Sequence, residues 1–158
     1  MFKVGDKVVY PMHGAGIIES IEEREVLGEI RSYYIMRIPV GDMKVMIPRD
    51  NVKEIGLRGI IGLDEMPQIL RILKDRTDTM NTNWNKRFRC NMDKIKTGSI
   101  FEVAEVVRNL ILRERDKGLS TGERKMLESA KQIMVSELVL ANNLAEEQVE
   151  DMIQQVLA

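Results

Sequence analysis

Gly56-Leu57-Arg58-Gly59-Ile60-Ile61-Gly62 is the stretch at which the sequence changes from one pattern to another. Glycine loses more conformational freedom on folding than any other residue, so three glycines in seven residues disfavour a continuous helix or strand here. Before this stretch the apolar residues occur in short runs, and after it they recur at helical spacing. We therefore expect two structural units, residues 1–55 and 67–158, with residues 56–66 as the junction between them.

The first unit has the pattern of an all-β module. Its short runs are rich in β-branched and aromatic residues, and segments that contain glycine or proline separate them. The candidate strands are residues 7–10, 16–21, 33–38 and 44–47. Four or five antiparallel strands within about 50 residues predict a small barrel of the SH3 or Tudor type. Modules of this size bind other molecules more often than they catalyse reactions.

The second unit has the pattern of a helical bundle. Ser99-Ile100-Phe101-Glu102 and Ser120-Thr121-Gly122-Glu123 are both typical of a helix start, because the serine hydroxyl and the glutamate can cap free amide groups. Gly98 and Gly118 fit helix ends. We expect five helices: 68–74, 83–96, 99–117, one from 120 to the break at 142–143, and one from 144 to the C-terminus. The predicted fold class is α+β, a small N-terminal β-barrel followed by an all-α bundle.

Charge is distributed unevenly along the chain. The net charge is only -1, yet residues 68–125 hold 14 Lys and Arg against 8 Asp and Glu, whereas residues 126–158 hold 1 against 6. A basic strip can serve as an electrostatic footprint for nucleic acid. Mixed charges on helix faces are equally often only solvated, so the charge pattern alone leaves both interpretations open.

The residue inventory argues against catalysis. With one histidine and one cysteine the chain offers no His/Cys metal cluster, and no phosphate-binding glycine motif is present. We expect no catalytic residue, no metal and no cofactor. Charged residues occupy the N-terminus, and no apolar run approaches the ~18 residues that span a bilayer. We therefore expect a cytoplasmic protein, not an enzyme, that does not contact membranes.

Trp84, the only tryptophan, lies within Asn83-Trp84-Asn85-Lys86-Arg87-Phe88-Arg89. Its spacing to Phe88, Met92 and Ile95 is helical, which is typical of a core residue. Asn83 is a good N-cap, however, and would place Trp84 on the first helical turn, where a side chain can project beyond the helix end. An aromatic wedge beside cations is one way to hold a DNA base step.

Three stretches resemble a known family. The chain opens with Phe2-Lys3-Val4-Gly5-Asp6-Lys7-Val8-Val9-Tyr10-Pro11-Met12-His13-Gly14. This opening resembles that of the bacterial CarD/CdnL transcription regulators, whose N-terminal module is shared with the transcription-repair coupling factor. Asn83-Trp84-Asn85-Lys86-Arg87 and Gly118-Leu119-Ser120-Thr121-Gly122-Glu123-Arg124-Lys125-Met126-Leu127 are similar to the two signature stretches of the family's helical half. The resemblance covers essentially the whole chain, in order.

The resemblance implies a Tudor-like domain that docks on the β subunit of RNA polymerase and a helical domain that touches promoter DNA at the upstream edge of the melted region. On the first domain, Arg24 and the strand Val45-Met46-Ile47 would face the polymerase. Some family members have arginine where this chain has Met46, so one polar contact would be absent. The implied role is stabilisation of the open complex without sequence-specific readout, and we expect a monomer.

The resemblance also assigns the DNA contacts. Trp84 would be the minor-groove wedge, and the residues that would meet backbone phosphates are Lys86, Arg87, Arg89 and Arg124. Lys125 lies beside Arg124 at the same helix start, where the helix dipole adds partial positive charge.

Two other classes of function fit the residues. An architectural protein would bend DNA unaided and bind naked duplex tightly. A protein adaptor would keep Trp84 in its core and make no direct contact with DNA.

Overall fold

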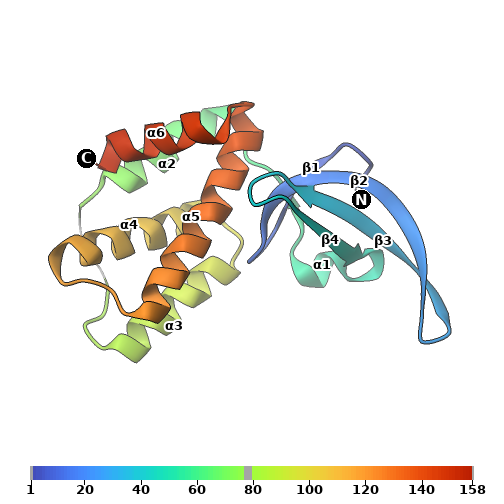
Figure 1. The fold of residues 1–158 in the computed structure, drawn as a ribbon, viewed down its shortest axis with the longest axis horizontal. Coiled ribbons are helices and arrows are strands. Elements are labelled where there is room, and N and C mark those ends of the chain that lie inside the picture. Colours follow the sequence, from blue (N-terminus) through green and yellow to red (C-terminus); the bar gives the residue numbers. More distant parts are fainter. Residues whose placement is uncertain (1, 77–79, 158) are drawn as a thin grey trace.

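The computed structural model describes residues 2–76 and 80–157, and its N-terminal half is a five-stranded antiparallel sheet (Figure 1). The strands are β1 (Lys7–Tyr10), β2 (Gly14–Val26), β3 (Glu29–Ile38), β4 (Met43–Pro48) and β5 (Arg58–Gly59), in the order β4-β3-β2-β1-β5. Two short elements, a 3₁₀ turn at Arg49–Asn51 and α1 (Val52–Ile55), lead from β4 toward β5. The small β domain followed by helices confirms the predicted fold class.

The sheet differs from the sequence prediction in two places. Residues 58 and 59, expected in the junction, form β5, which pairs with β1 through Val8↔Gly59 and Val9↔Arg58. Two residues are too few to show a strand periodicity. The β2–β3 hairpin is also longer than expected, because Leu27 (φ 53°) and Gly28 (φ 81°) form a tight turn and charged residues continue both strands to it. Figure 1 shows this hairpin extending beyond the rest of the domain.

A compact apolar core holds the β domain together. Its fully or almost fully buried members come from four strands and from the segment before β5: Val8, Ile18, Tyr34, Met36, Ile38, Ile47 and Leu57. Phe2 packs edge-on against Tyr34, with ring centroids 6.5 Å apart, and so brings the N-terminus into this core.

Five helices follow within residues 66–76 and 80–157, as predicted. They are α2 (Met66–Lys74), α3 (Trp84–Lys96), α4 (Ile100–Asp116), α5 (Thr121–Asn142) and α6 (Glu146–Leu157). A 3₁₀ turn at Leu63–Glu65 precedes α2. Ser120 caps α5, since its Oγ accepts a hydrogen bond from the Glu123 amide at 3.2 Å. Ser99 occupies the N-cap position of α4, but its side chain makes no capping bond.

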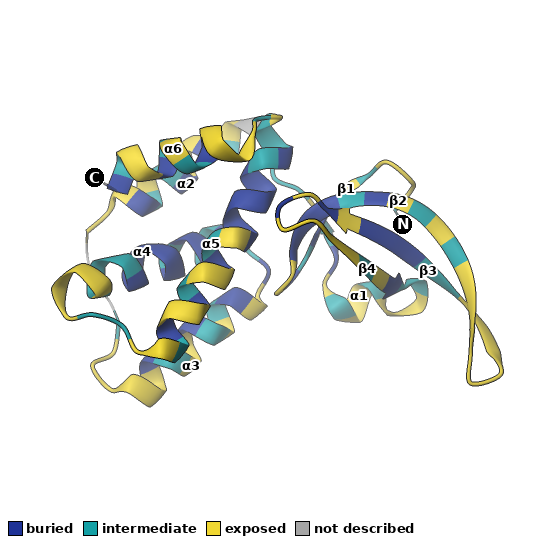
Figure 2. Ribbon diagram, viewed as in Figure 1, coloured by how far each residue is buried: buried dark blue, intermediate teal, exposed yellow. Residues whose placement is uncertain are grey.

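Helix α5 joins the two halves. It passes from the far end of the bundle to the sheet, and Figure 2 shows its buried residues concentrated toward the β domain. Ser136 Oγ accepts a hydrogen bond from the Ala15 amide at 2.8 Å. Gly14 has φ 122°, and a Cβ at this position would lie 2.9 Å from Ser136 Oγ, so the close approach of β2 to α5 requires glycine.

A charged pair next to this contact ties the junction to α5. Glu137 is 2% exposed, and its carboxylate accepts hydrogen bonds from Arg58 Nη1 at 2.8 Å, Arg58 Nη2 at 2.7 Å and the Ile61 amide at 2.9 Å. Arg58 also donates to the Gly98 carbonyl through Nε and Nη2. Arg58 therefore connects the sheet with the α3–α4 loop and with α5 at the same time.

Candidate nucleic-acid interface

The start of α3 positions Trp84 as the first residue of the helix. Asn83 has extended backbone angles, and its Oδ1 accepts a hydrogen bond from the Lys86 amide at 3.1 Å, which confirms the predicted N-cap. A residue on the first turn has no preceding helical turn to cover it. The Trp84 side chain consequently lies at the end of the helix.

Trp84 is 42% exposed and combines features of both interpretations. One face of its ring stacks on Phe88, with centroids 4.9 Å apart and planes 16° from parallel. Its Nε1 donates a hydrogen bond to Ser120 Oγ at 3.0 Å, across to the start of α5. The ring is therefore held at one face and one edge, and part of it meets solvent.

Arg87 requires a correction to the sequence-based assignment. It is only 2% exposed, so its guanidinium does not lie on the surface where a phosphate would bind. Its Nε and Nη2 donate to the two oxygens of Glu123 at 2.8 and 3.2 Å, and Nη1 donates to the carbonyls of Asn81 and Thr82. All its nitrogens thus have acceptors inside the protein. Arg87 connects α3, the segment before it and α5.

Glu123, the partner of Arg87, is 1% exposed. Burial raises the pKa of its carboxyl group, but the hydrogen bonds and positive charge of Arg87, with hydrogen bonds from Ser120, outweigh burial and leave the pKa below the ordinary glutamate value. The carboxylate is therefore ionised at neutral pH. The sequence gives Glu123 only as the capping-box residue of α5, and its pairing with α3 depends on tertiary structure.

The remaining predicted cations lie on the surface around Trp84. Lys86 and Arg89 are exposed on α3, and Arg124 and Lys125 are exposed near the start of α5. The hydrogen bond between Trp84 and Ser120 shows that these two helix starts adjoin. The start of each helix carries partial positive charge and free amide groups, so the two ends and four cations form a surface suited to phosphates.

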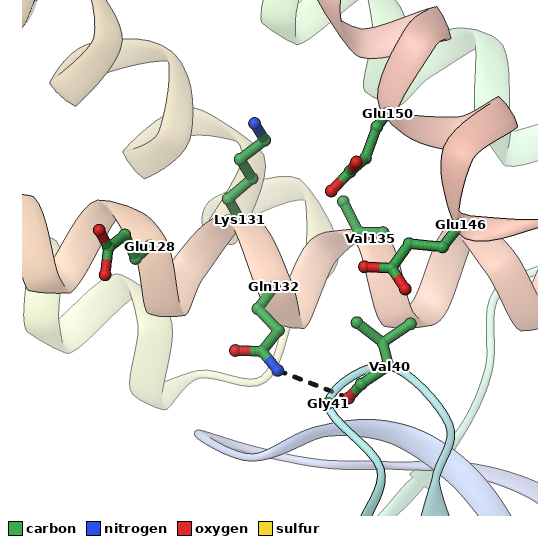
Figure 3. A pocket seen from close by; sticks show the side chains of 8 residues that line it. All are labelled: Val40, Gly41, Glu128, Lys131, Gln132, Val135, Glu146 and Glu150. Atoms are coloured by element: carbon green, nitrogen blue, oxygen red, sulfur yellow. Dashed lines mark hydrogen bonds between the residues drawn. The ribbon is translucent and has the colours of Figure 1, made fainter.

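A hollow farther along α5 has the opposite character. Figure 3 shows Glu128, Glu146 and Glu150 around it together with Lys131, between the β3–β4 loop and the helices α5 and α6. Gln132 closes one side, and its Nε2 donates to the Val40 carbonyl at 3.5 Å. Because three carboxylates surround this hollow, it does not suit a nucleic-acid phosphate.

The residues predicted to face a protein partner lie on two faces of the sheet. Strand β4 is an edge strand, so part of its backbone is open to pairing. Met46 lies opposite Ile35 of β3, and Arg24 lies opposite Arg31. Positions 31 and 35 are on the same face, since side chains alternate along a strand. Met46 (43% exposed) and Arg24 therefore share one surface.

Ile47 and Val45 point to the other face. Ile47 is completely buried in the core of the β domain, and Val45 is half-buried against it. The side chain of Ile47 therefore supports the sheet and does not form part of a surface, which corrects its assignment as a partner contact. Tyr33, between positions 31 and 35, is a half-buried member of the outer face that the sequence pattern did not single out.

Other kinds of site are not indicated in the part of the chain that the structure describes. Within residues 2–76 and 80–157, no three His, Cys, Asp or Glu side chains come together as metal ligands would. Across the same residues, no helix has the combination of length and apolar character needed to cross a bilayer.

Comparison with known proteins identifies the relatives of this chain. Residues 2–61 match the model of the CarD-like/TRCF RID domain, and residues 68–154 match the model of the CarD C-terminal domain. The chain belongs to the CarD family. The two CarD matches lie on either side of residues 62–67, and the first of them includes β5.

A curated CarD relative covers almost the whole chain. The protein named "Putative transcription factor YdeB", from Bacillus subtilis (strain 168), is 41% identical over 149 residues, which are 94% of this chain and 97% of that protein. Among solved structures, the solution structure of the 72-residue N-terminal domain of Myxococcus xanthus CarD is 36% identical, with a TM-score of 0.33, and the match covers 37% of this chain and 79% of that domain.

Proposed function

We propose that this CarD-family chain is a transcription regulator that docks on the β subunit of RNA polymerase and stabilises the promoter open complex. The β domain would hold the polymerase. The helical domain would contact DNA at the upstream edge of the melted region, with Trp84 in the minor groove and no base-specific readout. The observation that carries the proposal is the exposed, stacked ring of Trp84 between two adjoining helix starts and beside exposed cations.

The physical chemistry of the surface favours a wedge. Apolar side chains enter the minor groove between base steps and kink the duplex at the cost of unstacking a step. Where the DNA strands have already separated, the base step is already unstacked, and the ring can enter it without the cost of unstacking. An aromatic ring that fills such a step therefore binds the open state more strongly than closed duplex, and this difference shifts the equilibrium toward the open state.

The cations supply affinity without sequence preference. With Arg87 buried, the exposed set is Lys86, Arg89, Arg124 and Lys125. A protein with few phosphate contacts binds free DNA weakly, because affinity depends on the number of counterions released. Docking on polymerase would place this surface near the promoter at a high effective concentration, so weak contacts suffice.

The β domain offers a suitable docking surface. The open edge of β4 can accept a strand from a partner, and the main-chain hydrogen bonds of such a pairing need no catalytic residues. Met46 of β4 and Arg24 of β2 lie on the same face of the sheet, with β3 between them. Met46 would provide an apolar contact next to the added strand, and Arg24 would provide a charged contact farther along the same face.

Open-complex lifetime, measured with full-length variants and purified polymerase, tests the proposal. Trp84→Ala should bind polymerase normally, melt within roughly 5 °C of the parent because the ring is only partly buried, and lose most of the lifetime gain. Met46→Glu should weaken polymerase binding, because a carboxylate placed in an interface loses its hydration without an assured partner. Val4→Ala, which removes an exposed apolar side chain from a surface loop, is the matched control.

Two results would contradict the proposal. A full lifetime gain by well-folded Trp84→Ala would exclude the wedge. Tight binding of the parent protein to naked duplex at physiological salt, without polymerase, would instead favour an architectural DNA-binding protein.

A further inference from the structure

The indole of Trp84 is attached to a helix other than its own. Its Nε1 donates to Ser120 Oγ at 3.0 Å, and Ser120 is the N-cap of α5. The sequence predicted Ser120 only as a cap. The structure gives its hydroxyl a second partner on the surface that would meet DNA.

The Ser120 hydroxyl makes as many hydrogen bonds as its one hydrogen and two lone pairs allow. It accepts from the Glu123 amide at 3.2 Å, donates to Glu123 Oε1 at 3.2 Å and accepts from Trp84 Nε1. A hydroxyl has one hydrogen and two lone pairs, so these three bonds use all of them. Since the ionised carboxylate of Glu123 can only accept, the hydroxyl hydrogen turns toward it and a lone pair faces the indole. The arrangement of the donors and acceptors is therefore unique.

Glu123 is itself fixed from the interior. Arg87 holds both carboxylate oxygens, and Nη1 of the same guanidinium holds the carbonyl of Thr82 just before α3. A continuous series of hydrogen bonds thus runs from the buried ion pair through Ser120 to the exposed ring.

Packing restricts the ring further. Phe88 covers one face of the Trp84 ring, and a Cβ placed on Gly122 would lie 3.8 Å from Trp84 Cζ2. Cζ2 is on the same edge as Nε1, so this edge faces the start of α5. Trp84 is nevertheless 42% exposed, so part of its ring is available to a ligand.

We propose that Ser120 is the positioning residue for Trp84: its hydroxyl fixes the direction of the indole ring and keeps the indole N–H paired when the ring leaves water. This inference rests on the proposed role of Trp84 as a minor-groove wedge. The indole N–H is only a donor, and an unpaired donor is costly in an apolar base step. With Ser120 as its partner, the ring enters the step with its donor satisfied. A ring that is already ordered also loses less conformational freedom on binding.

The free protein tests the positioning directly, without polymerase or DNA. The chain has one tryptophan, so fluorescence and the single indole N–H resonance report on Trp84 alone. In the parent protein the indole N–H should exchange with solvent more slowly than in free tryptophan. Ser120→Ala should accelerate this exchange and add a fast component to the decay of fluorescence anisotropy. Ser120→Thr keeps a hydroxyl and should retain the parent behaviour.

Ser99→Ala is the matched control, because Ser99 is also an N-cap serine but makes no side-chain capping bond. It should leave the indole signals unchanged. An unprotected indole N–H in the parent protein would overturn the proposal, and so would indole signals in Ser120→Ala identical to those of the parent. The parent measurement decides even if Ser120→Ala folds poorly.

Open-complex lifetime then connects positioning with function. Ser120→Ala should shorten the lifetime by roughly two- to tenfold, the range expected for loss of one hydrogen bond, and Ser120→Thr should restore it. If Ser120→Ala frees the indole but keeps the full lifetime while Trp84→Ala loses it, the positioning role is wrong and the wedge stands. If Trp84→Ala also keeps the full lifetime, the proposed function itself is wrong.

Discussion

Arg87 and Glu123 form an ion pair in which both side chains are 2% exposed. The cost of removing two charges from water offsets much of their attraction, so such a pair adds little net stability compared with apolar residues. Removal of one partner is different, because the other charge stays buried without compensation. The main consequence of the pair is geometric, since it fixes the start of α3 against the start of α5.

Arg87→Gln should therefore affect stability more than DNA binding. We expect a loss of about 3–5 kcal/mol in the free energy of unfolding, the usual cost of breaking a buried pair. Arg89→Gln removes a neighbouring exposed charge and should change stability by no more than about 0.5 kcal/mol. Denaturant titration of both variants checks this. Equal stabilities would show that Arg87 is not held in the interior in solution.

The same pair predicts a dependence on pH. Burial raises the pKa of Glu123, but Arg87 and Ser120 outweigh this effect and leave the pKa below the ordinary glutamate value of 4.5. When the pH falls below the pKa that Glu123 has in the unfolded chain, the unfolded chain binds a proton at this residue and the folded chain does not. The free energy of unfolding therefore decreases as the pH falls from about 4.5 through the lower pKa of Glu123 in the folded state. Glu123→Gln should lack this component. Parallel acid-denaturation curves for the parent and Glu123→Gln would contradict the prediction.

The burial of Arg87 shows what an apolar pattern omits at the scale of residues. The sequence pattern placed Phe88, Met92 and Ile95 in the buried stripe of α3. In the structure the fully buried positions are Arg87, Asn91 and Ile95, which also recur every four residues. Two of the three are polar, and their burial depends on partners from other segments. The positions of the apolar residues alone therefore do not reveal such a stripe.

The starts of helices were predictable from the sequence where a capping residue marks them. Asn83 and Ser120 cap their helices as the sequence indicated, because each cap involves only residues within one turn. Strand β5 was not predictable, since its two residues pair with β1, some 50 positions earlier in the chain. The contact between the starts of α3 and α5 is likewise tertiary, yet it brings the candidate site together.

This contact yields a prediction about salt. Lys86 and Arg124 lie on different helices that meet at Trp84, so both should contact phosphates of the same DNA segment. Lys86→Gln combined with Arg124→Gln should weaken binding to the polymerase–promoter complex similarly on different promoters. The log-log slope against salt should decrease by about 0.9 for each lost contact.

Lys96→Gln is the control for this experiment. Lys96 is exposed at the opposite end of α3, roughly 15 Å from Lys86 by the rise of the helix, and its loss should leave the slope unchanged. Loss of binding on only one promoter sequence would indicate base readout instead of phosphate contact.

In the proposed function, the relative orientation of the two halves determines whether polymerase and DNA can be held at once. The sequence left this orientation open and suggested only a glycine-rich junction. The structure places Arg58 of that junction against Glu137 of α5, and β2 against α5 through Ala15 and Ser136. Docking of the β domain on polymerase would raise the effective concentration of the helical half at the DNA only if the geometry allows both contacts at once. A fixed orientation of the two halves would meet this condition.

Glu137→Gln should therefore separate docking on polymerase from stabilisation of the open complex. The amide keeps the volume of the side chain but lacks the charge that holds Arg58, and an amide presents only one oxygen to a guanidinium that now binds two. Polymerase binding should persist because the β domain is intact, whereas the open-complex lifetime should fall. To measure this, Cys90 is replaced by serine and spin labels are attached at Leu27 and Lys117, which are exposed and lie on different halves. In this background, Glu137→Gln should give a broader distribution of distances between the labels than the parent does.

Glu105→Gln provides the comparison, since it breaks the Lys94–Glu105 pair within the helical half and should change neither distribution nor lifetime. If Glu137→Gln broadens the distribution but keeps the parent lifetime, a fixed orientation is unnecessary for function. If the distribution stays narrow, the contacts of β2 with α5 suffice to hold the halves, and Arg58 only strengthens the junction. A broad distance distribution together with a shortened open-complex lifetime would show that the interface between the halves must be rigid. Only then would docking of the β domain on polymerase position Trp84 at the DNA.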